Sequence, residues 1–104
     1  MILPASVRIA YLTCPVKPMA ADGPELSGRF DEDTGVIEIA SGHSDPLLVD
    51  ALLHEMVHAM LYLGNAGLEP DTEERVVRVL TTQLLSAMRD NSELFVAMMQ
   101  TVRG

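Results

Sequence analysis

The residues of this chain with the clearest chemical potential are two histidines four positions apart, His54 and His58, with Glu55 directly after the first. Residues four apart on an α-helix lie one above the other, about 5 to 6 Å apart, so both imidazoles can bind one metal ion. Zinc accepts such ligands readily. Glu55 is rotated by about 100° from His54, so it borders the metal without sharing the ligand face. This position suits a general base acting on water, and the H-E-x-x-H motif makes zinc-dependent peptide hydrolysis the leading hypothesis.

A catalytic zinc ion typically has three protein ligands and an open position, so a third ligand must come from elsewhere in the chain. His43 lies eleven residues before His54, and a helix between them would separate the two by roughly 13 to 16 Å, so His43 is rejected. The longer motif that ends in a third histidine requires Gly at 61 and His at 64, where this chain has Leu61 and Gly64. The protein is therefore not a metzincin.

The remaining candidates for the third ligand are Glu73 and Glu74. Glu74 precedes Val77 by three positions and Glu73 precedes it by four, so helical periodicity hardly separates them. We prefer Glu74 and keep Glu73 as the alternative. Either carboxylate could instead only complement the helix dipole, which is worth about 0.3 to 1 kcal/mol.

Tyr62 follows His58 by four residues and lies on nearly the same side of the expected helix. Its hydroxyl could donate a hydrogen bond to a developing oxyanion, but such a tyrosine more often belongs to the core. Tyr11 has the same two interpretations with less in favour of a functional one, so it is left out of the site.

The elements that must position these residues begin with a small N-terminal sheet. Residues 7–13 read V-R-I-A-Y-L-T, which favours a strand. Prolines and glycines after this segment predict a loop over residues 17–27. Two short segments, 28–31 and 36–40, then flank a turn that contains Gly35, and they predict a hairpin. The sheet is expected to be small and at least partly antiparallel.

The motif helix is expected from about Pro46 to Leu63, with Asp45 as its N-cap and Gly64-Asn65 closing it. Nearly every position outside the motif is apolar, so we expect most of its circumference to be buried.

A second long helix, capped by Asp71 or Thr72, is predicted to run to about Arg89. Apolar residues at helical spacing should pack it against the motif helix; they are Val77, Leu80, Leu84 and Met88. A short last helix over residues 93–101, capped by Ser92, offers apolar surface for packing or self-association.

Composition limits the class of protein. With 104 residues, the chain is expected to form a single α+β domain over residues 1–104. Its single cysteine cannot form an internal disulfide, and its start lacks the pattern of a secretion signal, so a cytoplasmic location is expected. Charged and polar motif residues interrupt the apolar stretches, so we expect no membrane span.

The charge distribution bears on partners. The net charge is −8, and between Arg29 and Arg75 eleven acidic residues occur without any lysine or arginine. Nucleic acid is an unsuitable partner for this stretch, because its binding requires neutralised phosphates. A preference for basic peptides is one interpretation, and a solvated acidic surface is the one we favour.

The order of these features resembles the zincin-like peptidases of the gluzincin type. It is most similar to small zincin-like proteins of phages and prophages, and more distantly to the ImmA/IrrE metallopeptidases, over roughly Gly28 to Asn91. This resemblance implies a minimal zincin-like fold and a Zn²⁺ ion on His54, His58 and Glu74, with Glu55 as general base. The chain departs from the ImmA/IrrE pattern because no E-A-N-x-F-A segment follows and no DNA-binding domain is attached.

The function expected from the sequence is therefore a zinc metallopeptidase acting on a peptide or protein substrate. The alternative is a non-catalytic zincin-like module in which the metal or the helix pair serves folding, and the apolar helical surface serves assembly with phage or host proteins or with further copies of the chain. Four protein ligands on the metal would favour the module, whereas three would favour the enzyme.

Overall fold

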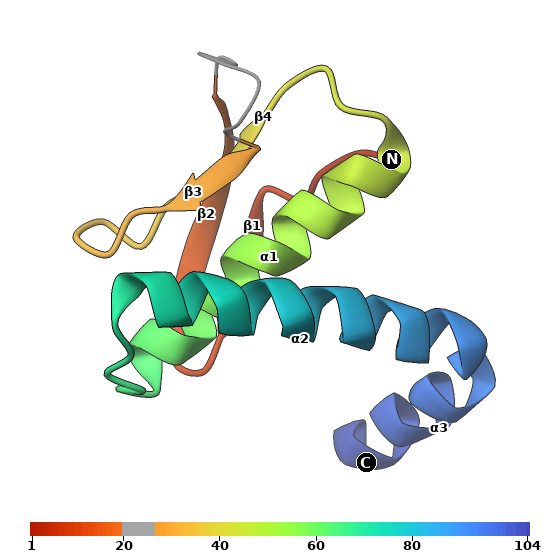
Figure 1. Cartoon of the computed structure of the whole chain (residues 1–104). Coiled ribbons are helices and arrows are strands. Elements are labelled where there is room, and N and C mark those ends of the chain that lie inside the picture. The colour runs from red at the N-terminus through yellow and green to blue at the C-terminus, as the bar shows by residue number, and fades with distance from the viewer. Residues whose placement is uncertain (20–26) are drawn as a thin grey trace.

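The computed structural model describes residues 1–19 and 27–104. In this part of the chain a four-stranded sheet lies beside three helices (Figure 1), which confirms the expected α+β class. The elements in chain order are β1 (Ser6–Ile9), β2 (Leu12–Met19), β3 (Gly28–Phe30), β4 (Ile37–Ala40), α1 (Asp45–Leu63), α2 (Pro70–Asp90) and α3 (Ser92–Arg103).

The sheet has the strand order β1-β2-β4-β3. The outer pairs β1/β2 and β3/β4 are antiparallel, whereas the central pair β2/β4 is parallel. The prediction of a partly antiparallel sheet is confirmed. Strand β3 is an edge strand that hydrogen-bonds only to β4 among the described strands, and it also contacts α1.

The prediction of a single strand over residues 7–13 is wrong, because the chain reverses direction inside that segment. Ile9 of β1 pairs with Leu12 of β2, which leaves Ala10 and Tyr11 as a two-residue turn. Ala10 has a φ of 53°, a conformation that such turns normally assign to glycine or asparagine. An alanine-tyrosine pair carries no turn signal, so the reversal could not be read from residue types.

The predicted loop over residues 17–27 is also wrong at its start, since β2 continues to Met19. Val16 donates its N–H to Ala5 on the β1 side, so the ring nitrogen of Pro15, one residue earlier, points away from β1. The carbonyl of Met19 accepts a bond from Ser41 beyond β4, so the nitrogen of Pro18 points away from β4. At each proline, no described strand pairs with β2 on the side of the ring nitrogen, an arrangement that a strand tolerates. Residues 20–26 of the predicted loop lie outside the described residues.

The predicted hairpin is confirmed as β3 and β4. Gly35 has a φ of 75°, as expected for the turn. The carboxylate of Asp31 accepts hydrogen bonds from the backbone N–H groups of Asp33 (2.9 Å) and Thr34 (3.3 Å). Asp31 therefore belongs to the turn and not to the strand, and it orders the turn by satisfying two backbone donors.

All three helices begin earlier than predicted. The N-caps are Ser44, Glu69 and Asn91, and none makes a side-chain capping bond. The predictions of Asp45, of Asp71 or Thr72, and of Ser92 as N-caps are therefore wrong. In α2 the earlier start follows from Pro70, whose preset helical φ lets the helix begin at this residue.

The predicted ends of the two long helices are accurate to within a residue. Helix α1 stops at Leu63, and Asn65 takes the left-handed conformation with a φ of 54°. Helix α2 stops at Asp90, one residue after the predicted end.

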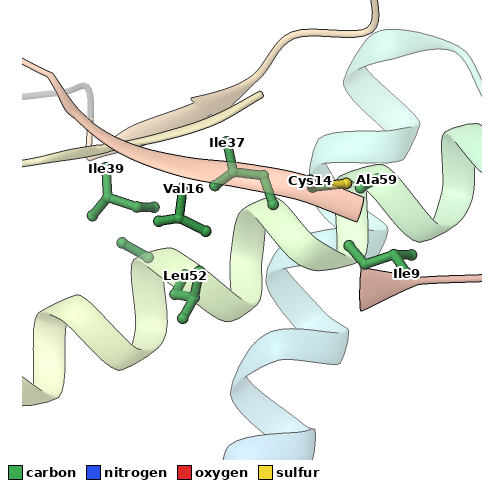
Figure 2. Close-up of a cluster of buried hydrophobic side chains, with 8 residues drawn as sticks. Ile9, Cys14, Val16, Ile37, Ile39, Leu52 and Ala59 are labelled. Atoms are coloured by element: carbon green, nitrogen blue, oxygen red, sulfur yellow. The ribbon is translucent and has the colours of Figure 1, made fainter. Parts of the chain in front are cut away.

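The hydrophobic core lies between the sheet and one side of α1 (Figure 2). Ile37 and Ile39 of β4 are almost fully buried, and they face Leu52 and neighbouring small residues of the helix. Cys14 is a buried free thiol in the same cluster, and burial raises its pKa. This core holds α1 against the sheet and thereby orients the two motif histidines.

The expectation that α1 is buried around most of its circumference is wrong. Its buried positions are Ala51, Leu52, Glu55, Val57 and Ala59, whereas Leu47, Val49, Met60 and Tyr62 are exposed. The sheet covers one side of the helix and α2 covers part of another, so apolar residues at both helix ends remain in solvent.

By length and composition alone, α1 could cross a membrane, since it has 19 residues and few charges. Core helices of soluble proteins pass the same test, and α1 packs on the sheet and on α2. The absence of a membrane span remains a prediction.

Helix α2 packs on α1 only through its first half (Figure 1). Val77 is fully buried there, as predicted, together with Thr81. The prediction that Leu80, Leu84 and Met88 also pack against the motif helix is wrong, because α2 continues past α1 and leaves them 37% to 46% exposed. The spacing of these residues correctly predicted that they share one face of α2. The sequence does not show how much of that face α1 covers.

Gly28 provides the first test of this packing. A Cβ at Gly28 would lie 2.7 Å from the carbonyl oxygen of Glu38 and 3.3 Å from the Glu55 side chain. Gly28→Ala should therefore lower the free energy of unfolding by about 1 to 3 kcal/mol, as for other overpacked sites. Urea denaturation measures this change, with the exposed neighbour Ser27→Ala as the control. Equal stability of both variants would contradict the close approach of β3 and α1.

Candidate metal centre

The two motif histidines lie side by side on α1, as their spacing predicts. Their ring centroids are 5.0 Å apart, and the side chains of His54 and His58 are 22% and 17% exposed. Two half-buried imidazoles need polar partners. Those partners are supplied by the first turn of α2.

Glu74 bridges the two histidines. One carboxylate oxygen lies 3.0 Å from Nε2 of His54, and the other lies 2.9 Å from Nε2 of His58. One ligand atom from each residue lies within 4.8 Å of the other two, so the three can hold a metal ion. Donors about 2.0 to 2.2 Å from a tetrahedrally coordinated metal ion are roughly 3.3 to 3.6 Å apart, so the distances from Glu74 to the two histidines are compatible with a bound ion. That Glu74 and not Glu73 is the third ligand stays a prediction.

Glu73 contacts the same histidine from the opposite edge of its ring. Its carboxylate lies 2.7 Å from Nδ1 of His58. Metal-binding histidines commonly donate their second ring N–H to a carboxylate, which fixes the tautomer and the ring orientation. Glu73 therefore does more than complement the helix dipole, and the sequence analysis missed this role. The signal was present, since two adjacent glutamates open a helix that follows the motif.

Glu55 occupies the position expected for a residue that borders the metal. Glu55 is only 6% exposed, although it carries an ionisable carboxyl. Its side chain extends from α1 toward Gly28 of β3. Burial raises its pKa to about 7, while the neighbouring His58 opposes this rise and the Glu74 carboxylate adds to it. A carboxyl with a pKa near neutrality can both accept and release a proton at ordinary pH.

The two histidines differ in their electrostatics. Burial lowers the pKa of His54, and the nearby Glu74 carboxylate only partly offsets this effect. Burial also opposes the charge on His58, but its hydrogen bonds to Glu73 and Glu74 and the charge of Glu55 outweigh burial and raise its pKa. His58 has a carboxylate at each ring nitrogen, and both contacts favour its protonated form.

These residues open into a cavity of about 680 Å³, within the range of sites that bind small ligands or peptide side chains. Arg78 lies at this cavity, with Nη2 3.5 Å from Glu74. It follows Glu74 by four residues on α2, so helical spacing could have identified it. The lining residues are Ser27, Gly28, Arg29, Phe30, Glu32, Asp50, Ala51, His54, Glu55, His58, Glu73, Glu74 and Arg78.

The other sequence candidates lie outside this centre. His43 is not part of the metal-binding group, as expected. Tyr62 does not line the cavity of about 680 Å³. Its ring packs against Phe30, with centroids 5.9 Å apart, and it remains 44% exposed, so it is not a core residue.

Comparison with known protein families, curated protein sequences and solved structures found no significant match. The resemblance to zincins therefore remains a prediction from the motif residues.

Metal analysis tests the ligand set directly. Protein purified without a polyhistidine tag should bind about one zinc ion, and Glu74→Ala should lose most of it because a ligand is removed. Glu73→Ala should keep the ion but bind it about 10 to 100 times more weakly, the usual effect of removing a carboxylate behind a ligand. Elemental analysis and competition with a chelator measure both quantities. A larger loss for Glu73→Ala than for Glu74→Ala would reverse the assignment.

The raised pKa of Glu55 predicts a pH effect on the metal-free protein. Glu55 has an ordinary pKa of 4.5 in the unfolded chain and about 7 in the folded one, so the folded state binds more protons between these values. Its contribution to stability is therefore lost as pH rises through this window. Relative to wild type, Glu55→Gln should gain up to about 3 kcal/mol between pH 4.5 and 8. Chelator-treated samples in urea measure this, with the exposed Glu69→Gln as control, and a difference independent of pH would contradict the burial of the charge.

Proposed function

We propose that this chain is a zinc-dependent peptide-bond hydrolase in which His54, His58 and Glu74 hold the metal. The observation that carries the proposal is the convergence of these ligand atoms beside a buried carboxylate and an open cavity. When bound there, zinc supplies a Lewis acid that polarises a carbonyl group and acidifies water.

Glu55 is the proposed general base. Its carboxylate accepts a proton from the attacking water and then delivers that proton to the leaving amine. The raised pKa supports this double role, because a carboxyl poised near 7 loses little free energy in either direction. Its contact with β3 restricts the carboxylate to the side of α1 that faces the cavity.

Two further side chains support the same chemistry. Glu73 orients the imidazole of His58 through Nδ1 and leaves Nε2 to face the metal position. The Arg78 guanidinium at the cavity is placed to donate to negative charge that develops on the scissile carbonyl oxygen, the role considered for Tyr62 from sequence.

A peptide or protein is the substrate class that the surroundings suit best. Three residues of edge strand β3 line the cavity, and an extended peptide can add to such an edge through backbone hydrogen bonds. The metal-binding group contains three residues among positions 1–19 and 27–104, and three protein ligands leave a position open for chemistry.

A second candidate function is a non-catalytic module in which the metal joins α1 to α2. Its support is the small apolar contact between these helices, since only Val77 and Thr81 of α2 are buried. A metal that binds only the folded state would add about 2.7 kcal/mol of stability at 100 times its Kd.

The peptidase proposal is tested by incubating the zinc-loaded protein with a proteome-derived peptide library and identifying new termini by mass spectrometry. Wild type should cleave the library, and Glu55→Gln should lower the rate at least 100-fold while keeping its zinc, because the general base alone is lost. Glu69→Gln, the same change at an exposed site outside the cavity, should cleave like wild type.

Full activity of Glu55→Gln would contradict the role of Glu55. A wild-type protein that holds zinc but cleaves nothing in the library would favour the non-catalytic module.

A further inference from the structure

The surface richest in exposed apolar side chains lies outside the cavity of the candidate metal centre. It spans residues 79–104, which comprise the second half of α2 and all of α3, and we call this segment the C-terminal arm. Nine large apolar side chains of the arm are between 37% and 80% exposed; they are Val79, Leu80, Leu84, Met88, Leu94, Val96, Met98, Met99 and Val102. Such a concentration in a protein of 104 residues indicates a binding surface.

The arm has almost no core of its own. Helix α3 contains no buried residue, and the last buried residue of α2 is Thr81. A 12-residue helix is marginal in water when nothing covers its apolar side. Figure 1 shows the arm projecting beyond α1, and the radius of gyration of 14.1 Å exceeds the value of about 13 Å expected for a compact domain of this length.

The net charge differs between the C-terminal arm and the rest of the chain. Residues 1–78 contain thirteen acidic and five basic residues and thus carry the whole net charge of −8. The arm contains Arg89, Arg103, Asp90 and Glu93 and is neutral. Two arms can therefore approach each other without like-charge repulsion, while their projection keeps the two acidic bodies apart.

We infer that the C-terminal arm is the interface of a homodimer, in which the arms of two copies pack face to face. Helices from two copies can close into a bundle around a two-fold axis and cover each other's apolar side chains. A stable interface usually buries about 800 Å² per partner. The nine exposed apolar side chains among the 26 residues of the arm are the surface available for it.

The dimer is independent of the proposed peptidase activity, and it leaves the metal cavity accessible. The cavity is lined by residues 27 to 78 and by none of the arm. Association through the arm therefore changes neither the ligand set nor the access of a substrate to it.

Sedimentation of the full-length protein over a concentration series tests the interface. Wild type should approach twice its monomer mass of 11.3 kDa at micromolar concentration. Leu84→Glu on α2 and Met98→Glu on α3 should each weaken the dimer about 100-fold or more, because each places a charge in an apolar interface. Leu47→Glu, the same change at an exposed apolar residue of α1, should leave the dimer intact.

Hydrogen exchange of wild type supplies a second measurement that needs no substitution. Amides of residues 79–104 should exchange more slowly at high protein concentration, whereas those of α1 should not change. A monomer at all concentrations, or a dimer that Leu84→Glu and Met98→Glu leave unaffected, would overturn the inference and assign the arm to a different partner.

Discussion

The contact between two imidazoles of α1 and two carboxylates of α2 is the interaction on which the rest of this structure depends. Helix α2 buries only Val77 and Thr81, so apolar packing alone fixes its position weakly. Glu73 and Glu74 meet His58 from both edges of its ring, which sets the register of one helix on the other. The same contact brings together the three side chains that could hold a metal, beside the cavity. The position of α2 on α1 and the geometry of the candidate site therefore depend on the same contact.

The sheet contributes to the candidate site mainly because β3 lies close to α1, and less through functional side chains of its own. Its core with α1 orients the motif helix, and Gly28 lets edge strand β3 approach the Glu55 side chain. Water is thereby excluded from one side of that carboxyl, and its pKa rises to about 7. A buried carboxyl is unfavourable for folding when ionised, so the position of Glu55 suits the general base that we propose better than it suits a stabilising role.

Local signals in the sequence predicted the elements whose physics is local. The hairpin followed from Gly35 and its flanking residues, and the motif helix followed from its apolar positions and its closing Gly64-Asn65. The reversal at Ala10-Tyr11 carries no turn residue, and Pro18 resembles a loop residue until the structure shows that, of the described strands, only β4 pairs with β2 at this position. Strand pairing decided both cases, and residue types do not encode it.

By itself, the sequence determined that His54 and His58 share one helix face and that Glu55 lies next to that face, because helical geometry requires it. It also placed two glutamates at the start of the next helix. Only the tertiary structure shows where each carboxylate lies, since the crossing of α2 on α1 directs Glu74 to both Nε2 atoms and Glu73 to Nδ1 of His58. The crossing of the two helices also decided which apolar residues of α2 are buried. An amphipathic pattern predicts which face of a helix is apolar, but not how much of that face the neighbouring helix covers.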